Sequence, residues 1–492
     1  MVGSLKDEIV KSSKWSFATE LLAKLVVPVT NMILARLLVP EAFGVVAMVT
    51  MVTTFAEMLS IAGFQKYIVQ HDFDSEEDER KQVLVAFWSN LFLALILWLI
   101  IAIFDEQIAV LVGSKGLGIV ITIASVSIPI NAVSSIQIAL LQRSFKFKAL
   151  FKLRLLTIFI PLIVTVPLAY YGFGYWALVI GTIVTNFMAV VVLLILSPYK
   201  ISFYYDFNLL RGMLSFSIWS LIEAISIWLT VWSDVFIIAA LLSTYYLGIY
   251  KNAMTAVNSC LAIVTAATTP ILFSALSRLQ NNSEQYNYTF FSFQKLVALF
   301  VVPMGVGIYC YRDIVVAILF GAKWHDADLF VGLWGLSSAM MIVLGHYCSE
   351  VYRSKGMPRI SFLAQVLHLV VLIPVIYWAA SSYSFEGLIW ARALVRIQAI
   401  LVDFLFMYFV IKISPLKMIT NILPFLGISI LMVGLSTAIR PLFVGIGWSL
   451  FTIIICIVFY FFVLTLIPEY RNLLVKVFSH IFTNKHKSCA GR

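Results

Sequence analysis

Long runs of apolar residues make up most of the chain, and short polar segments separate them. A helix needs about 20 consecutive apolar residues to cross a bilayer, and runs of this length recur along the whole sequence. The pattern predicts fourteen membrane-spanning helices, near residues 15–38, 43–64, 83–104, 118–141, 154–171, 175–197, 213–241, 247–275, 293–312, 329–351, 361–381, 387–411, 420–439 and 443–467. We therefore expect an all-α polytopic membrane protein.

The Lys and Arg residues fall mostly on one side of these predicted spans. If the N-terminus is cytoplasmic, 25 of the 34 basic residues lie in segments on the cytoplasmic side, and six lie in loops or span ends on the other side. Cytoplasmic loops of membrane proteins carry an excess of Lys and Arg. The count predicts that both termini face the cytoplasm.

Composition agrees with this prediction. The 492 residues are 62% hydrophobic and only 12% charged, whereas a soluble domain carries roughly a quarter charged residues. A net charge of +10 would suggest nucleic-acid binding in a soluble protein, but here the position of the charges matters more than their sum. The five cysteines form no CxxC pair, so we expect neither a disulfide framework nor a zinc site.

Two pairs of segments predict an internal repeat. LLVPEAFG (37–44) follows the first span and LLSTYYLG (241–248) follows the seventh, 204 residues later. QRS (142–144) after the fourth span matches YRS (352–354) after the tenth, 210 residues later. Chance similarity between Leu-rich segments is the alternative interpretation.

An even number of spans per repeat gives both copies the same orientation, so an axis along the membrane normal relates them. The sequence then predicts two six-helix lobes around a central cavity, plus two additional C-terminal helices. The expected segments are a cytoplasmic N-terminus (1–14), an N-terminal lobe (15–211), a C-terminal lobe (212–411), two additional transmembrane helices (412–467) and a basic cytoplasmic tail (468–492).

Charged and amide residues recur inside the predicted spans. A charge at the centre of a span costs roughly 2.5–3.5 kcal/mol, so each one tends to face a cavity or a partner. At 100° per residue, these residues form stripes on single helices. They are Glu20, Lys24 and Asn31 in the first span, Glu57 in the second, Glu223 and Asp234 in the seventh, and Arg392, Arg396 and Asp403 in the twelfth. We interpret the stripes as the lining of a cleft between the lobes.

Plainer interpretations remain open for several of these residues. The acid and the lysine of the first span can form a neutralised pair near the interface, and the two arginines can pair with Asp403 or Glu386 purely for assembly. Asp234 lies close enough to its span end for interfacial solvation. Glu350 is expected to be solvated or paired with Arg353.

Motifs typical of enzymes are missing. The chain has no GxxxxGK[ST], HExxH or GxSxG segment, and the predicted outer loops are too short for a catalytic domain. The acidic run Asp72–Glu79 is most simply a solvated loop, with a metal-dependent transferase site as the alternative. We therefore expect a transporter rather than an enzyme.

Four short segments resemble those of a known family. They are LARLLVPEAFG (34–44), GFQKYIVQ (63–70), LGIYKNA (247–253) and FGAKW (320–324). Together and in this order they are similar to segments of the Wzx-type polysaccharide and O-antigen flippases. These flippases form the polysaccharide transporter branch of the multidrug/oligosaccharidyl-lipid/polysaccharide exporter superfamily. The chain departs from the pattern at Ser243-Thr244, where many members have Leu-Gly.

The resemblance implies alternating access by two six-helix lobes. It also implies a substrate, an oligosaccharide repeat unit on undecaprenyl pyrophosphate. Such a unit moves from the cytoplasmic to the periplasmic leaflet of the bacterial inner membrane, for O-antigen, capsule or exopolysaccharide synthesis. The residues expected to contact the pyrophosphate in the cavity are Lys24, Asn31, Arg392 and Arg396. Those expected to hold H+ or Na+, or to position the cations, are Glu20, Glu57, Glu223, Asp234 and Asp403.

No cofactor and no metal is expected. The lipid-linked oligosaccharide and membrane lipids are the expected partners, and H+ or Na+ and the polysaccharide polymerase machinery are further candidates. Three alternatives stay open: a cation-coupled drug exporter of the same superfamily, a membrane polysaccharide polymerase, and a scaffold that transports nothing.

Overall fold

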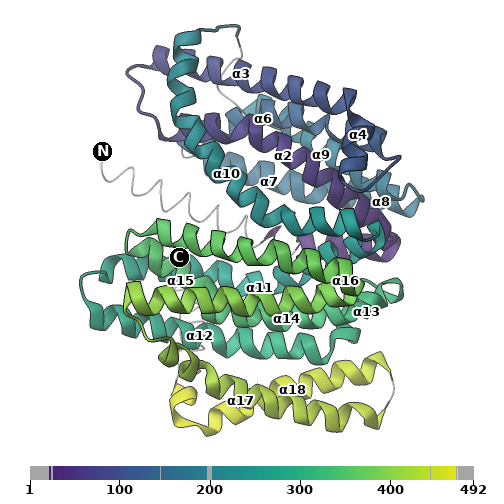
Figure 1. Ribbon diagram of the computed structural model, residues 1–492, viewed down its shortest axis with the longest axis vertical. Coiled ribbons are helices and arrows are strands. Elements are labelled where there is room, and N and C mark those ends of the chain that lie inside the picture. Colours follow the sequence, from purple (N-terminus) through teal and green to yellow (C-terminus); the bar gives the residue numbers. More distant parts are fainter. Residues whose placement is uncertain are drawn as a thin grey trace, which may run out of the picture. The chain divides into compact units, whose positions relative to one another are not determined.

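The computed structural model describes residues 22–23, 26–144, 146–196, 202–443, 445–472 and 474. These residues form helices and connecting turns, with no β-strand among them (Figure 1). Twelve of their helices are long and apolar enough to cross a membrane, and a shorter apolar helix covers Val26–Leu37. The predicted all-α polytopic membrane fold is confirmed.

The longest helix, α16 (Pro358–Phe406), explains part of the difference between the twelve candidate spans of the described residues and the fourteen spans predicted from the sequence. Its 49 residues would extend about 74 Å, more than twice the thickness of a hydrocarbon core of ~30 Å. At Tyr383 and Ser384 the backbone leaves the helical region, and Ser384 takes the positive φ of 58°. His368 Nδ1 lies 3.1 Å from Gln398 Oε1 across this bend. The bend makes a hairpin, whose two arms match the predicted spans 361–381 and 387–411.

The chain divides into two compact units. The first comprises Met1–Asn252, Leu319–Lys323 and Ala380–Phe385. In it, α2 packs against α3, α6, α9 and α10, and α7 packs against α9. Besides Val26–Leu37, its helices are α2 (Pro40–Gln70), α3 (Glu76–Ile103), α4 (Asp105–Leu111), α5 (Gly118–Ala124), α6 (Ser127–Arg143), α7 (Phe147–Ile160), the π-helix η1 (Pro161–Thr165), α8 (Val166–Tyr170), α9 (Tyr175–Leu196), α10 (Phe207–Leu241) and the first residues of α11 (Thr244–Leu279).

The second unit comprises Ala253–Ile318, Trp324–Ala379 and Glu386–Arg492. In it, α12 packs against α14 and α17, and α17 packs against α18. Besides most of α11 and α16, its elements are α12 (Ser283–Cys310), α13 (Arg312–Leu319), the short helix η2 (Ala322–Ala327), α14 (Asp328–Met341), the π-helix η3 (Ile342–His346), α15 (Tyr347–Ser354), the π-helix η4 (Met407–Ile411), α17 (Pro415–Ile439), the short helix η5 (Arg440–Leu442) and α18 (Ile446–Leu466).

Polar residues in the connecting segments set where several long helices begin. The Ser75 hydroxyl accepts a hydrogen bond from the Asp78 amide at 3.1 Å, and the first turn of α3 holds four acidic residues, which the positive end of a helix favours. Asp206, Asn282 and Ser414 cap α10, α12 and α17 in the same way. The loops predicted from polarity thus fix the ends of the apolar helices.

The last helix, α18, shows how burial is arranged for lipid rather than water. Its polar side chains Thr452, Cys456 and Tyr460 are buried, and the Tyr460 hydroxyl donates to the Leu299 carbonyl at 3.0 Å. Large apolar residues of the same helix are exposed, among them Val458 at 62%. Because hydrocarbon solvates apolar side chains and offers no hydrogen bonds, this distribution is the one expected for a membrane-spanning helix.

The two LL…G segments of the predicted repeat contact each other within the first unit. A Cβ atom at Gly44 of α2 would overlap the Thr244 carbonyl of α11, and one at Gly248 of α11 would overlap the Pro40 carbonyl of α2. In the predicted repeat, Pro40 and Gly44 correspond to Thr244 and Gly248. The two contacts are therefore equivalent, each between the glycine of one segment and the first of these two positions in the other. Small residues at such a crossing let helix backbones approach closely in a membrane.

We predict that Gly44→Ala lowers the thermal stability of the purified protein, because the added methyl group meets backbone that has no rotamer to change. Overpacking of this kind costs about 1–3 kcal/mol. Unfolding in detergent, followed by tryptophan fluorescence, measures the effect. Gly212→Ala is the control, since a Cβ at Gly212 meets nothing within 4 Å. Equal stability of the two variants would contradict the contact.

Candidate functional site

Glu57 of α2 lies in a polar cluster inside the first unit. Its Oε1 accepts hydrogen bonds from Asn131 Nδ2 at 2.7 Å and from Ser127 Oγ at 3.4 Å, both on α6. One turn earlier, Thr54 Oγ1 accepts from Trp228 Nε1 of α10 at 3.3 Å. Thr54 and Glu57 therefore face two neighbouring helices, and neutral donors hold the carboxylate of Glu57.

Asp234 of α10 is buried rather than solvated at the membrane interface. Only 1% of its surface is exposed. The Tyr250 hydroxyl donates to Oδ2 at 2.5 Å, and the Val235 amide donates to Oδ1 at 2.8 Å. Nearby, Lys251 Nζ lies 4.1 Å from the centre of the Trp232 ring. The interpretation as an interfacial, solvated acid is wrong, because Tyr250 near the start of α11 covers this carboxylate.

The two predicted arginines of the twelfth span contact one aromatic side chain in the second unit. The guanidinium carbons of Arg392 and Arg396 lie 5.0 and 3.7 Å from the centre of the Trp334 ring on α14. Trp334 Nε1 in turn donates to Asn258 Oδ1 of α11 at 3.0 Å. Their spacing of four residues places both arginines on one face of α16, so both reach the same ring.

Asp403, on the same predicted stripe, has a separate partner. The Tyr352 hydroxyl of α15 donates to its Oδ1 at 3.1 Å and to its carbonyl oxygen at 3.2 Å. The carboxylate of Asp403 is buried, with 8% of the residue exposed. Glu350 is also buried and forms the expected ion pair, with Arg353 Nη2 2.6 Å from its Oε1.

Asn31 lines a cavity of about 420 Å³ within the first unit. The walls come from the helix Val26–Leu37, from α7 with η1, and from α9. Asn31 was predicted as a site residue, but its companions Arg154 and Asn186 were not. Polar residues at helical spacing in the sixth span (182, 185 and 186) were the signal that pointed to this face.

Three other predicted site residues cannot be placed. Glu20 and Lys24 lie outside the described residues, and so does the side chain of Glu223. Their roles stay predictions.

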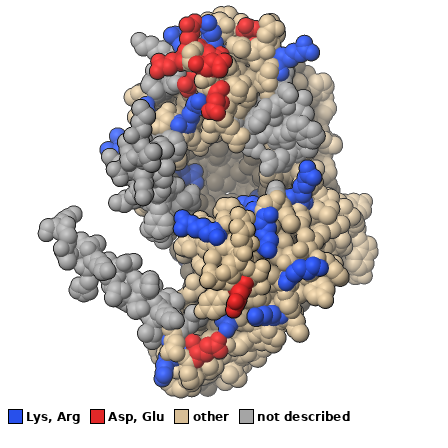
Figure 2. All heavy atoms as spheres, turned by 90° about the vertical axis from the view of Figure 1, so that its left-hand side faces the viewer, with Lys and Arg blue, Asp and Glu red and all other residues tan. Residues whose placement is uncertain are grey.

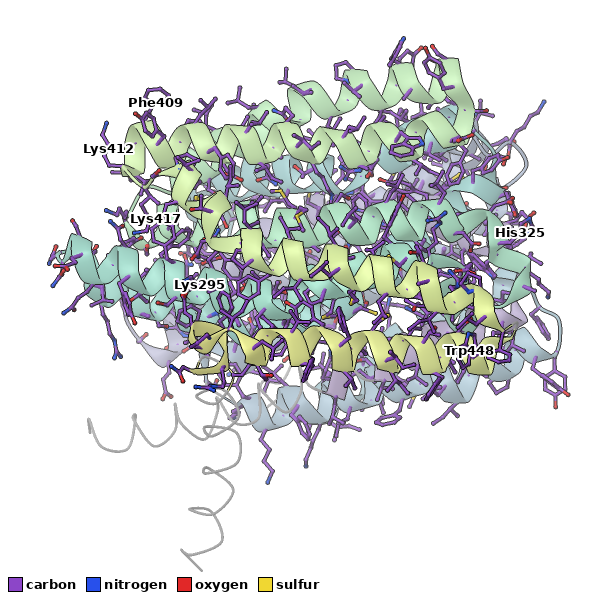
Figure 3. The ribbon with its side chains drawn as sticks, turned by 90° about the horizontal axis from the view of Figure 1, so that it is seen from below. Lys295, His325, Phe409, Lys412, Lys417 and Trp448 are labelled. Carbon is purple, nitrogen blue, oxygen red and sulfur yellow. The ribbon has the colours of Figure 1, made fainter. Side chains whose placement is uncertain are left out.

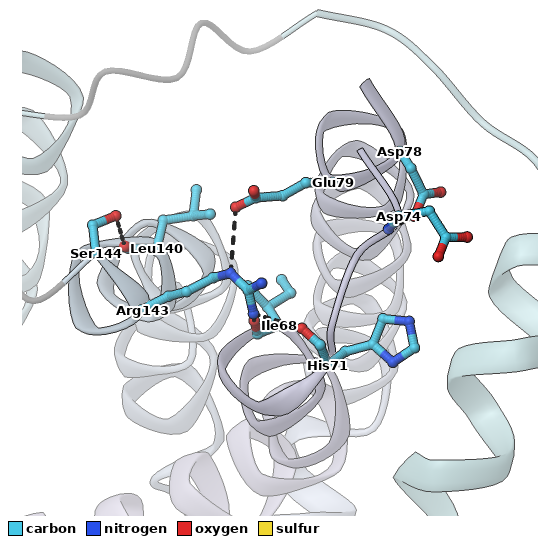
Figure 4. Close-up of polar contacts among 8 residues, drawn as sticks. All are labelled: Ile68, His71, Asp74, Asp78, Glu79, Leu140, Arg143 and Ser144. Carbon is cyan, nitrogen blue, oxygen red and sulfur yellow. Dashed lines mark hydrogen bonds and ion pairs between the residues drawn. The ribbon is translucent and has the colours of Figure 1, made fainter. Parts of the chain in front are cut away.

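Arg143, at the end of α6, holds the turn between α2 and α3 (Figure 4). Its Nη1 donates to the carbonyl oxygens of Ile68 and His71 at 3.0 and 2.6 Å, and its Nε lies 3.6 Å from Glu79.

Figure 2 shows acidic side chains gathered at the top of the view, next to basic side chains. In the described part of the chain, no three His, Cys, Asp or Glu side chains are grouped to hold a metal ion.

Tyr67 and Gln82 tie the same helix ends together. The Tyr67 hydroxyl donates to Gln82 Oε1 at 2.9 Å, and Gln82 Nε2 donates to the two carboxylate oxygens of Asp78 at 3.0 and 2.9 Å. Burial raises the pKa of the Tyr67 hydroxyl, and the Asp78 carboxylate adds to that effect. The hydroxyl therefore stays protonated at neutral pH and remains a donor.

The sequence matches a family model described as a polysaccharide biosynthesis protein. The match covers residues 33–328, more than half of the chain, and includes Asn131 and Asp234 but not α16. The chain belongs to this family.

This polysaccharide biosynthesis protein has named relatives in several bacteria. It is 25% identical to the succinoglycan biosynthesis transport protein ExoT of Rhizobium meliloti (strain 1021), over 74% of this chain and 72% of that one. It is 21% identical to the lipopolysaccharide biosynthesis protein WzxC of Escherichia coli (strain K12), over 76% and 75%. It is 20% identical to the teichuronic acid biosynthesis protein TuaB of Bacillus subtilis (strain 168), over 88% and 90%.

Two solved structures share the fold of the family member described here. The lipid II flippase MurJ in an inward closed conformation matches with a TM-score of 0.72 and 16% identity, over 94% of this chain and all of that one. An inward-facing multidrug resistance transporter of the MATE family matches with a TM-score of 0.59 and 15% identity, over 78% and 93%. The fold predicted from the family resemblance is confirmed.

We predict that Asn131→Leu destabilises the protein, because the Glu57 carboxylate loses its shortest hydrogen bond inside a span. Leaving one buried partner unpaired costs about 1–3 kcal/mol, whereas replacing both partners by apolar groups is nearly neutral. The double variant Glu57→Leu/Asn131→Leu should therefore be more stable than the single Asn131→Leu variant. Thermal unfolding in detergent of the wild type, the two single variants and the double variant gives the coupling energy between Glu57 and Asn131. Additive effects of the two substitutions would contradict the pairing.

Proposed function

We propose that this polysaccharide biosynthesis protein is a flippase and not an enzyme. It moves an oligosaccharide repeat unit on undecaprenyl pyrophosphate from the cytoplasmic to the periplasmic leaflet by alternating access, for the synthesis of O-antigen, capsule or exopolysaccharide. Support comes from relatives named for succinoglycan transport and for lipopolysaccharide and teichuronic acid biosynthesis. The similarity to a lipid II flippase supports the fold that such transport requires.

The observation that carries the proposal is the pair of arginines on Trp334. A pyrophosphate is too costly to move through a low-dielectric slab unless cations accompany it. Arg392 and Arg396 supply two guanidinium groups within a membrane-spanning helix, and guanidinium binds phosphate oxygens in a bidentate way. The aromatic ring stabilises both cations and so offsets part of the cost of keeping them in the span. Asn31 and Lys24 are the further candidates for the substrate head group.

The acidic residues are the candidates for coupling. Glu57, Asp234 and Asp403 each lie in a membrane-spanning helix and accept a hydrogen bond from an uncharged side chain. Glu20 and Glu223 are proposed for the same role from the sequence alone. Coupling is not obligatory, because an inside-negative potential of ~100 mV already favours outward movement of one negative charge by about 2.3 kcal/mol.

The proposed location is the bacterial inner membrane with both termini in the cytoplasm. Figure 3 shows Lys295, Lys412 and Lys417 at one end of the second unit, and His325 and Trp448 at the opposite end. The lysine-rich end is the one that the positive-inside rule assigns to the cytoplasm. The lipid-linked oligosaccharide and membrane lipids are the partners in this proposal, together with H+ or Na+ and the polymerase machinery.

A cation-coupled drug exporter is the second candidate, favoured by the fold shared with a multidrug transporter and by acids within the spans. Its cationic substrates would not need an arginine pair. Resistance to cationic drugs, measured in the same strains as polymer export, separates the two functions.

We predict that deleting the gene abolishes surface polysaccharide while lipid-linked repeat units accumulate in the inner leaflet. A plasmid with the wild-type gene should restore export. Arg392→Gln/Arg396→Gln should reduce export at least about tenfold at equal protein level, because charge-assisted hydrogen bonds to phosphate are lost. Arg359→Gln, at the exposed start of the same helix, is the matched control.

Two results would contradict this proposal. Repeat units that reach the periplasm but stay unpolymerised in the deletion strain would indicate a polymerase. Normal export by the double arginine variant would show that the pair on Trp334 does not carry the substrate.

A further inference from the structure

The cavity between the helix Val26–Leu37, α7 and α9 lies wholly within the first unit. Its volume of about 420 Å³ falls in the range of roughly 300–1,000 Å³ that small-molecule sites occupy. Its shape depends on two backbone features. Pro161 begins the π-helix η1 in the wall, and Gly181 lets α9 approach η1 so closely that a Cβ there would overlap Thr165 Oγ1. Such π-turns frequently mark functional sites.

Hydroxyl groups line this cavity on three sides, and most of their hydrogens are already used. Thr30 donates to the Val26 carbonyl at 3.0 Å, Thr157 to the Arg154 carbonyl at 3.0 Å, and Thr185 to the Gly181 carbonyl at 2.7 Å. Each hydroxyl oxygen still has lone pairs to offer. The threonines therefore present acceptors to the cavity, which suit a ligand rich in O–H donors.

Two amide side chains face the same space without a protein partner. Asn31 and Asn186 are half-buried, and within the described residues neither side chain forms a hydrogen bond. An amide in a membrane span loses free energy unless water or a ligand satisfies it. Each amide offers two N–H donors and one acceptor oxygen, the combination that pairs with vicinal hydroxyl groups.

Arg154 supplies the charge of the cavity. In the described part of the chain, its guanidinium takes part in no ion pair and no side-chain hydrogen bond, and no acidic residue lines the cavity. It lies seven residues into α7, about 10 Å along the helix. In the proposed orientation this is the cytoplasmic half of the membrane. Arg154 is exposed, so its guanidinium can take an anionic oxygen of a ligand that the hydroxyl and amide groups hold in the cavity.

We propose that this cavity binds a sugar ring that carries an anionic group, either a carboxylate or a phosphate ester. The amides and the threonine oxygens take the ring hydroxyls, and Arg154 takes the anionic oxygens. The inference rests on the proposed function, because it makes the ring a part of the lipid-linked oligosaccharide. It adds a site that the arginine pair of the second unit does not provide, one that selects among head groups by their sugar.

The test uses the purified full chain in detergent and three probes: glucose, glucuronate and glucose 1-phosphate. Binding is measured by saturation-transfer NMR titration. We expect the wild-type protein to bind one or both anionic sugars at least about tenfold more tightly than glucose, since a charge-assisted contact is worth that much. The probe preferred, glucuronate or glucose 1-phosphate, identifies the anionic group.

Variants assign the contacts. Arg154→Gln should abolish the preference for anionic sugars and leave glucose binding unchanged, whereas Asn31→Leu/Asn186→Leu should abolish binding of all three. Lys152→Gln, an exposed lysine two residues away on α7 that does not line the cavity, is the matched control. Thermal unfolding of each variant excludes misfolding as the cause.

The inference is overturned if none of the three sugars binds the wild-type protein. It is equally overturned if Arg154→Gln and Lys152→Gln behave alike, which would mean that the arginine only extends to the membrane surface. Binding is measured without transport, so its failure is separate from that of the flippase proposal. A chain that binds sugar but does not support polymer export would leave this site standing and refute the function.

Discussion

Hydrocarbon gives a buried polar group nothing to bond to, so each polar side chain in a span needs a partner from the protein, from water or from a ligand. Three acidic residues of the spans follow that constraint. Asn131 donates a hydrogen bond to Glu57, Tyr250 to Asp234, and Tyr352 to Asp403. Where the protein supplies a partner, the polar residue joins two helices and orders the bundle. Asn31 and Asn186, which have no such partner among the described residues, both line the cavity of the first unit.

The lipid hydrocarbon also determines how closely the helices must pack. Lipid does not drive helices together by the hydrophobic effect, so dispersion contacts between closely approaching backbones must do so. Gly44 and Gly248 serve this purpose at the crossing of α2 and α11, and Gly181 does so between α9 and η1. Two glycines thus let the two repeat-equivalent segments come together, and a third shapes the cavity beside Asn31. Fold and site depend on the same feature of the sequence.

The sequence predicted these elements well but not their neighbours. Apolar length located the spans, including the two arms of α16, because length in a bilayer is a physical requirement that the sequence records directly. The stripe that contains Arg392 and Arg396 was predicted from helical periodicity, but Trp334, which both contact, was not. Periodicity gives the face of a helix and says nothing of which helix lies opposite. Arg154 stands at the start of the predicted span 154–171, a position that did not indicate a cavity.

The polar features of the two units differ in a way that bears on the substrate. The second unit places two arginines on one aromatic ring, a site for concentrated negative charge. In the first unit, Arg154 lines a cavity together with hydroxyl and amide groups, the site proposed for an anionic sugar ring. A lipid-linked oligosaccharide carries a pyrophosphate and hydroxylated rings, whereas a cationic drug carries no anionic group. The two proposed sites suit an anionic, hydroxylated substrate better than a cationic one, and this argument for the proposed flippase does not depend on the names of its relatives.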